Sequence, residues 1–169
     1  RILSAGVKFG MIPKVHTDQF YSIGGIDAAK KVKAISVDHL EVLNQEGITQ
    51  LKCTNIIATL LPGCSYFLNM IYPPARKLIE NGIPVALATD FNPGSCNTEN
   101  LQMIMSLASL KMKMTAEEII NAVTINGSFA LNIQNKTGSL TLGKQSDILV
   151  FDFPVYKDLI YHFGVNQLE

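Results

Sequence analysis

The sequence predicts an α/β protein, namely the C-terminal half (strands 5–8) of a (β/α)8 TIM-like barrel with a C-terminal segment entering a small accessory β-domain. Short apolar runs alternate with helical patterns roughly every 20 to 30 residues, as in parallel α/β folds. Three of the four apolar runs end at a His or Asp. Catalytic residues of a barrel lie at such strand ends, whereas a doubly wound sheet often carries a Gly-rich phosphate loop that is absent here. A complete barrel needs about 250 residues, so four units make half of one.

The four apolar runs are predicted to form buried parallel strands, because such strands read as continuous hydrophobic stretches. The first run reaches Asp18, the second ends at Asp38 and His39, Pro62 stops the third, and the fourth ends at Asp90. The runs cover residues 13–16, 34–37, 55–61 and 84–89.

Helices are predicted between and after these strands from apolar residues at helical spacing. Residues 73–81 have proline at the start and Gly82 just past the end, the usual helix asymmetry. Thr115 and Glu118 form the capping box of a later helix. Three other helices are marked by Ile26, Ala29 and Ala34, by Val42, Leu43, Ile48 and Leu51, and by Leu101, Ile104, Met105 and Leu107.

The chain is expected to divide near residue 135. Residues 1–135 carry the strand–helix units of the half-barrel. Residues 136–169 contain turn glycines and an apolar run at 148–153 without a following helix, which predicts one segment of the accessory β-domain. The chain opens at Arg1 inside a helix-like stretch, so the missing barrel strands are expected upstream.

Composition restricts the partners. With 47% hydrophobic residues and 14 basic against 14 acidic side chains, nothing favours nucleic acid or an anionic membrane. The apolar runs are too short to span a bilayer. The cysteines Cys53, Cys64 and Cys96 lack Cys-x-x-Cys spacing, which fits free thiols in a reducing, cytoplasmic location. A small-molecule substrate is the expected partner.

Three strand-end side chains are candidates for chemistry. Imidazole and carboxylate are common ligands of zinc or iron, so His16 and Asp90 are candidate metal ligands. His39 is a candidate base facing an activated water. Each has a structural alternative: a strand-end His or Asp can cap a turn or bond a neighbouring carboxyl group. His162 lies beyond the barrel and is assigned a structural role.

The loop after the fourth run offers polar groups. Asn92, Gly94 and Ser95 can present amides and a hydroxyl to an anionic ligand near a helix N-terminus. An Asx turn followed by a helix cap, supplied by residues 97–99, explains the same residues. Cys96 lacks a paired His in its segment, which argues against a nucleophile.

Together these motifs resemble the imidazolonepropionases of the amidohydrolase superfamily. The resemblance is carried by residues 16–20 (HTDQF), 36–41 (SVDHLE), 58–63 (ATLLPG), 88–95 (ATDFNPGS) and 161–166 (YHFGVN). It implies hydrolysis of 4-imidazolone-5-propanoate to N-formimidoyl-L-glutamate in histidine degradation, by an enzyme that is a homodimer in its full-length form.

The resemblance also assigns residues. It makes His16 and Asp90 ligands of one mononuclear site for zinc or iron (Fe2+ or Fe3+), with two further histidines in an upstream His-x-His motif. His39 and Asp90 are implied as catalytic groups. Substrate contacts are implied for Gln19, Asn92, Gly94 and Ser95; position 19 is acidic in some members and an amide in others.

Two other functions remain open. Another amidohydrolase, such as a nucleobase or triazine aminohydrolase, shares the layout of His, His and Asp on successive strands. The Asn-Pro-Gly-Ser sequence after Asp90 argues against it. An inactive, truncated half-barrel is the second alternative, and a substrate panel together with the upstream coding sequence would distinguish them.

Overall fold

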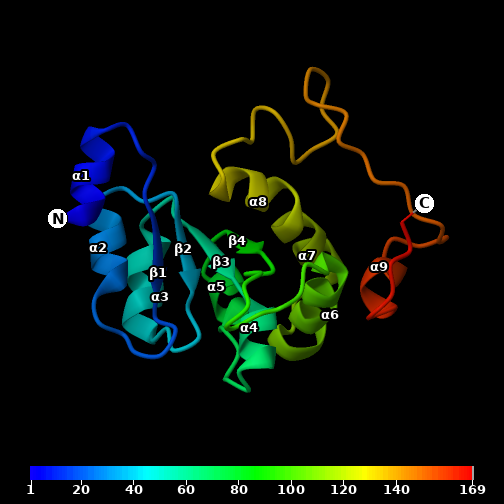
Figure 1. The fold of residues 1–169 in the computed structure, drawn as a ribbon, viewed down its shortest axis with the longest axis horizontal. Helices are drawn as coiled ribbons and strands as arrows, with labels where there is room; N and C mark the ends of the chain where they lie inside the picture. Colours follow the sequence, from blue (N-terminus) through cyan, green and yellow to red (C-terminus); the bar gives the residue numbers. More distant parts are fainter. Residues whose placement is uncertain (169) are drawn as a thin grey trace.

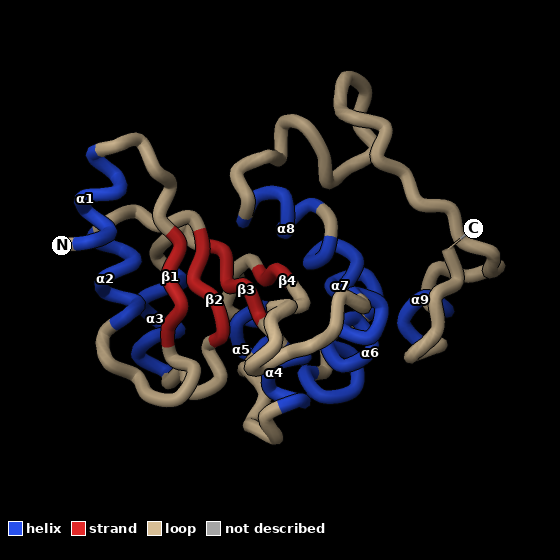
Figure 2. Tube along the Cα trace, in the orientation of Figure 1, coloured by secondary structure: helices blue, strands red, loops and turns tan. Residues whose placement is uncertain are grey.

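The computed structural model describes residues 1–168 and contains a four-stranded sheet. All four strands are parallel and lie side by side in chain order, as Figure 1 and Figure 2 show. They are β1 (Lys14–Thr17), β2 (Ser36–His39), β3 (Ile57–Leu60) and β4 (Val85–Leu87). The predicted parallel sheet is therefore confirmed, although β2 begins two residues later than expected, so that His39 is its last residue.

Most of the expected helices are present. They are α1 (Ile2–Lys8), α2 (Gly25–Lys31), α3 (Gln45–Lys52), α5 (Ala75–Glu80), α6 (Leu101–Met112) and α7 (Ala116–Val123). The capping box at Thr115 is formed in both directions. Some boundaries were wrong: Val42 and Leu43 precede α3, because Asn44 caps that helix by accepting a hydrogen bond from the Gly47 amide at 2.9 Å. Ala34 lies beyond the end of α2.

Three short helices were not predicted: α4 (Pro62–Phe67), α8 (Ile125–Ala130) and α9 (Asp158–Tyr161). Pro62 and Gly63 indicate the end of the third strand, yet Pro62 also begins α4, because proline is favoured in the first turn of a helix. A Cβ on Gly63 would lie 2.6 Å from Ile104 Cδ1 and 2.7 Å from Cys96 Sγ. Glycine is required there because α4 packs closely against α6 and the loop before it.

The sheet has two different faces. Strand side chains such as Val37, Leu60 and Val85 join the main core with the surrounding helices. On the other face, Ile57 of β3 and Ala86 of β4 meet Ala130 of α8. Because strand side chains alternate, register places His16, Asp38, Thr59 and Ala86 in one row across this second face. Polar groups thus occupy the face that would line a barrel interior.

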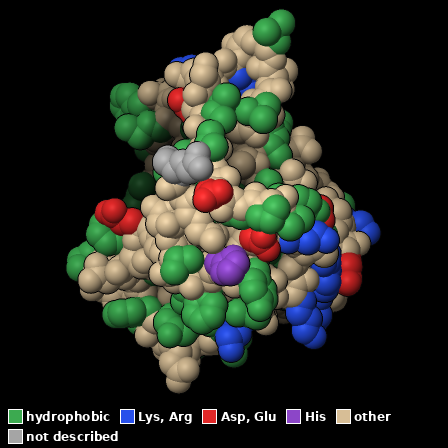
Figure 3. All heavy atoms as spheres, turned by 90° about the vertical axis from the view of Figure 1, so that its right-hand side faces the viewer, with side chains coloured by type: hydrophobic (Ala, Val, Ile, Leu, Met, Phe, Trp, Pro, Cys, Tyr) green, Lys and Arg blue, Asp and Glu red, His purple; other side chains and the backbone are tan. Residues whose placement is uncertain are grey.

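Residues 136–168 have little regular structure. The expected strand at 148–153 is reduced to a single bridge between Phe151 and Leu168, because no neighbouring strand among the described residues pairs with the rest of it. The helix α9 is tied to α6, since the Ser106 hydroxyl donates to the Ile160 carbonyl oxygen at 2.7 Å. Figure 3 shows the side of the molecule with this region, where hydrophobic patches lie among charges of both signs.

Among the described residues, no helix is long and apolar enough to cross a bilayer. The division near residue 135 stays a prediction.

Candidate active site

The three strand-end residues come together at the carboxyl edge of the sheet. The rings of His16 (β1) and His39 (β2) have centroids 5.0 Å apart. Potential ligand atoms of His39, Cys64 and Asp90 all lie within 4.8 Å of one another. The chain thus brings two histidines, one carboxylate and one thiol to one place, and the thiol was not predicted.

Left-handed backbone conformations shape this edge. Asp18, His39, Leu40 and Asp90 have φ values of 53°, 85°, 72° and 56°. Such values are uncommon outside glycine, carry a conformational cost, and cluster at functional sites. The turn at His39 and Leu40 is held from β1, because the Leu40 amide donates to the Thr17 carbonyl oxygen at 3.2 Å.

This turn places a carboxylate beside the second histidine. Glu41 Oε1 lies 3.5 Å from His39 Nδ1, and both side chains are almost fully buried. The Ser65 hydroxyl donates to the same Glu41 oxygen at 3.2 Å. Glu41 Oε2 and His39 Nδ1 have no hydrogen-bond partner among the described residues. A buried carboxylate with an unused oxygen beside an unused imidazole nitrogen is an arrangement that can fix the tautomer of His39.

The first histidine has its own acidic neighbour. His16 Nε2 lies 3.8 Å from Asp38 Oδ2, and Asp38 Oδ1 accepts a hydrogen bond from the Ser36 hydroxyl at 2.9 Å. The His16 side chain is 65% exposed. Its imidazole is therefore accessible from outside this chain.

The loop after Asp90 is organised by Asn92, in the Asx turn that was one of the two interpretations of these residues. Asn92 Oδ1 accepts the amides of Gly94 and Ser95 at 2.9 and 2.8 Å, and Asn92 Nδ2 donates to the Ser95 hydroxyl at 2.8 Å. These amides are therefore engaged within an Asx-type turn and do not point to a free anion site. The loop also does not lead straight into α6, whose cap is Asn100, not residues 97–99.

Two further site residues meet at α4. Gln19 Nε2 donates to Cys64 Sγ at 3.4 Å, and Cys64 is fully buried. Burial raises the pKa of the Cys64 thiol, and the nearby carboxylates of Glu41 and Asp90 raise it further, against lowering by Ser95 and Gln19. Burial likewise raises the pKa of Cys96, which fits the expectation that Cys96 is no nucleophile.

Sequence reasoning missed Cys64 and Glu41. Cys64 lies on α4, a helix that was not predicted, and Glu41 reaches His39 only through the left-handed turn. Glu41 could have been found from the sequence, because it is the last residue of the SVDHLE motif at 36–41. His162 is exposed next to α9, as a structural residue can be.

The donor set at this edge fits a catalytic metal. Imidazole nitrogen and carboxylate oxygen are favoured ligands of zinc and iron(II). His16 offers an imidazole nitrogen and Asp90 a carboxylate oxygen, while Nδ1 of the buried His39 faces Glu41. A catalytic metal site needs at least three protein ligands, so these two residues alone would not complete one.

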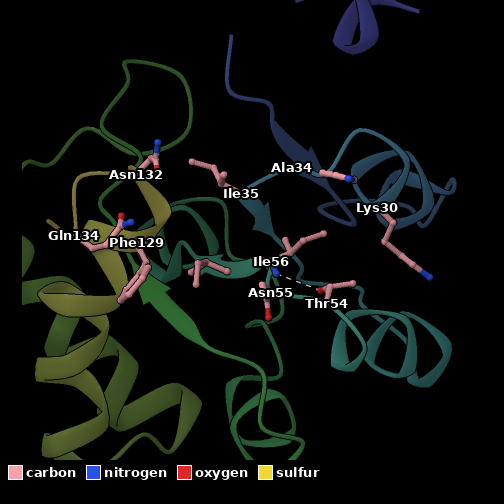
Figure 4. A pocket seen from close by; sticks show the side chains of 11 residues that line it. Lys30, Ala34, Ile35, Thr54, Asn55, Ile56, Phe129, Asn132 and Gln134 are labelled. Atoms are coloured by element: carbon pink, nitrogen blue, oxygen red, sulfur yellow. Dashed lines mark hydrogen bonds between the residues drawn. The ribbon is translucent and has the colours of Figure 1, made fainter. Parts of the chain in front are cut away.

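A cavity of about 500 Å³ lies at the opposite, amino-terminal end of the strands, lined by residues such as Lys30, Asn55, Phe129 and Gln134 (Figure 4). None of the candidate site residues lines it. Because barrel chemistry takes place at the carboxyl ends of strands, this cavity is assigned no catalytic role.

Known proteins resemble the chain in sequence. Imidazolonepropionases of Flavobacterium johnsoniae and Thermoanaerobacter pseudethanolicus are 48% and 47% identical over the whole chain. The chain covers 41% of each, so it spans about two fifths of the length of these curated relatives.

Solved structures agree on the fold. An adenosine deaminase from Xanthomonas campestris with bound zinc superposes with a TM-score of 0.82 at 19% identity, covering 98% of this chain and 44% of that one. The zinc complex of the atrazine chlorohydrolase TrzN from Arthrobacter aurescens gives 0.81 at 17% identity, covering 98% and 43%. The fold is the α/β amidohydrolase fold with a parallel sheet. The sequence model of the amidohydrolase family ("Amidohydrolase family") matches residues 19–167, and the chain therefore belongs to that family.

Proposed function

We propose that this chain is the C-terminal half of an imidazolonepropionase, which hydrolyses 4-imidazolone-5-propanoate to N-formimidoyl-L-glutamate in cytoplasmic histidine degradation. The observation that carries the proposal is the meeting of His16, His39 and Asp90 at one edge of the sheet. In this proposal β1 to β4 are barrel strands 5 to 8, and residues 136–169 belong to an accessory β-domain. A full-length homodimer is part of the proposal.

The metal is proposed to be held by His16 and Asp90 together with the two histidines of a His-x-His motif on the first, upstream strand. Zinc or iron in that place supplies Lewis-acid activation of water and of the ring carbonyl group. Zinc-bound structural neighbours support a metal, while the donor set suits either element.

The chain's own residues then divide the proton transfers. A proton on His39 Nδ1 faces Glu41, which leaves Nε2 free to accept the proton of the attacking water. The Asp90 carboxylate is placed to accept the second proton of that water and to pass it to the ring nitrogen that leaves when the amide bond breaks. Burial of His39 and Glu41 keeps bulk water from competing for these protons.

Substrate contacts are proposed for Gln19, Asn92, Gly94 and Ser95. The Asn92 turn uses the Gly94 and Ser95 amides internally, so the turn is expected to act as a rigid wall. Gln19 contacts Cys64 and is half-buried, which suits an amide that forms hydrogen bonds with the imidazolone ring.

The test joins this chain to the half that it lacks. Residues 1–169 are fused behind the upstream part of the Flavobacterium johnsoniae imidazolonepropionase, with the intact relative as control. We expect the fusion to consume imidazolonepropionate and to release formimidoylglutamate. The same fusion is offered guanine, adenosine and a chlorotriazine. A folded fusion that acts on one of these and not on imidazolonepropionate would overturn the proposal.

A further inference from the structure

We propose that His39, Cys64 and Asp90 form a second cation site, selective for a thiophilic divalent ion such as zinc or cadmium. This site differs from the catalytic pair of His16 and Asp90, although Asp90 belongs to both. An ion bound there would remove His39 from proton transfer and so lower turnover; this consequence rests on the proposed function. The binding of the ion does not depend on the proposed function.

Geometry is the first argument. The three residues come from β2, from α4 and from the loop after β4, so the fold, not local sequence, brings their ligand atoms within 4.8 Å of one another. Ligand atoms around a tetrahedral zinc at about 2.0–2.3 Å lie roughly 3.3–3.8 Å apart. The set closes around an ion with side-chain shifts of about 1 Å.

Burial and charge are the second argument. Cys64 is 0% exposed and His39 is 3% exposed, while Asp90 is half-buried at the opening. The buried Glu41 oxygen and His39 Nδ1 that lack partners lie at the same place. The carboxylates of Asp90 and of Glu41, which lies beside His39, place negative charge around this position and so favour a divalent cation.

Ligand chemistry gives the selectivity. A thiolate, an imidazole and a carboxylate suit zinc and softer ions, whereas magnesium or calcium prefer oxygen ligands. The contact to be displaced is weak, since Gln19 Nε2 reaches Cys64 Sγ at 3.4 Å. With three protein ligands, one position stays open, so the site should fill when metal is in excess and empty on dialysis.

The experiment detects metal bound to the Cys64 sulfur directly. The metal-free fusion protein is titrated with cobalt(II) and with cadmium(II), and sulfur-to-metal charge-transfer absorption is followed in the ultraviolet. We expect a saturable band that Cys64→Ala abolishes. Cys53→Ala, which removes an exposed cysteine, should leave it unchanged. His39→Ala and Asp90→Asn should each raise the metal concentration at half-saturation at least about tenfold. Circular dichroism checks folding, and Cys64→Ser replaces the alanine variant if that one unfolds.

The same titration of the fusion protein separates this proposal from the proposed function. The first equivalent of cobalt should fill the catalytic site without a sulfur band, and the second should bring the band. Excess zinc should inhibit turnover, and Cys64→Ala should raise the half-inhibitory zinc concentration at least about tenfold. Absence of the band at excess metal, or its survival in Cys64→Ala, would overturn the second site even in an active enzyme.

Discussion

Each histidine of the site faces one carboxylate, and the two pairs differ in burial. His16 is exposed beside Asp38, which is itself bonded to Ser36. His39 is buried beside Glu41, which is bonded to Ser65. An exposed imidazole can reach an ion from outside, while a buried one with a fixed tautomer suits proton transfer. The difference supports a ligand role for His16 and a base role for His39.

The first prediction separates these roles in the fusion protein. His39→Ala should leave metal content nearly intact and lower turnover by about 10²–10⁴, the range for a positioned acid–base group. Asp90→Ala should remove both metal and activity. Elemental analysis of the purified variants, alongside kinetic assays, makes the comparison. If His39→Ala also strips the tightly held catalytic metal that survives dialysis, His39 is a ligand of the catalytic site and its assignment as a base is wrong.

The second prediction concerns Glu41. Glu41→Gln keeps the size of the side chain but removes the charge that orients His39, so kcat should fall by about 10–100-fold with little change in KM. Glu46→Gln, in the first turn of α3, is the control with unchanged kinetics. Glu41→Asp should recover part of the loss. A change in KM alone would show that Glu41 shapes binding and not the base.

At the scale of elements, an ion pair clamps α5 to α7. Arg76 donates from Nη1 and Nη2 to the two oxygens of Glu118 at 2.9 and 2.7 Å, a bidentate pair. The Glu118 carboxylate also accepts the Thr115 amide that closes the capping box. Arg76 holds the pKa of Glu118 below its usual range. One carboxylate therefore stabilises a helix start and a contact between helices.

The third prediction follows from that pKa. A carboxyl group whose pKa is lowered by folding adds stability above its unfolded pKa of about 4.3, and this stability is lost as pH falls through the folded pKa. Glu118→Gln should therefore lower the free energy of unfolding by about 1 kcal/mol at pH 7. The difference from the parent should shrink toward zero in strong acid.

Urea unfolding of the fusion protein and of its Glu118→Gln variant, from pH 7 down to strong acid, measures this difference in the free energy of unfolding. Glu80→Gln is the matched control, because Glu80 is 63% exposed and contacts Arg76 once, at 3.5 Å. It should change stability by a few tenths of a kcal/mol. An equal effect of both variants, or a Glu118 effect that does not depend on pH, would contradict the assignment.

At the scale of the whole molecule, the sheet has two free edges. In the described residues β1 and β4 each pair on one side, and α1 buries none of its residues. Ile2, Phe9 and Met11 are more than 60% exposed near β1. Unpaired strand edges beside exposed apolar side chains favour association with further chain.

The fourth prediction is that residues 1–169 alone neither hydrolyse imidazolonepropionate nor retain metal through dialysis. Two of the four expected catalytic ligands are absent, so that site cannot close around the ion. The free edges at Lys14–His16 and Val85–Thr89 should lead to aggregates or domain-swapped dimers. Light scattering, metal analysis and activity assays test it together. A monodisperse, metal-loaded, active monomer would refute the claim that half the site lies upstream.

The sequence by itself determined the order of the strands and the edge at which His16, His39 and Asp90 meet. Apolar runs separated by helical patterns specify parallel strands, and all carboxyl ends of parallel strands share one edge. The tertiary structure decided the neighbours: that Glu41 faces His39, that Cys64 enters the site on α4, and that Asn92 occupies the amides of its own loop. These contacts depend on left-handed turns and on residues that are distant in sequence, so local patterns of hydrophobicity or propensity do not predict them.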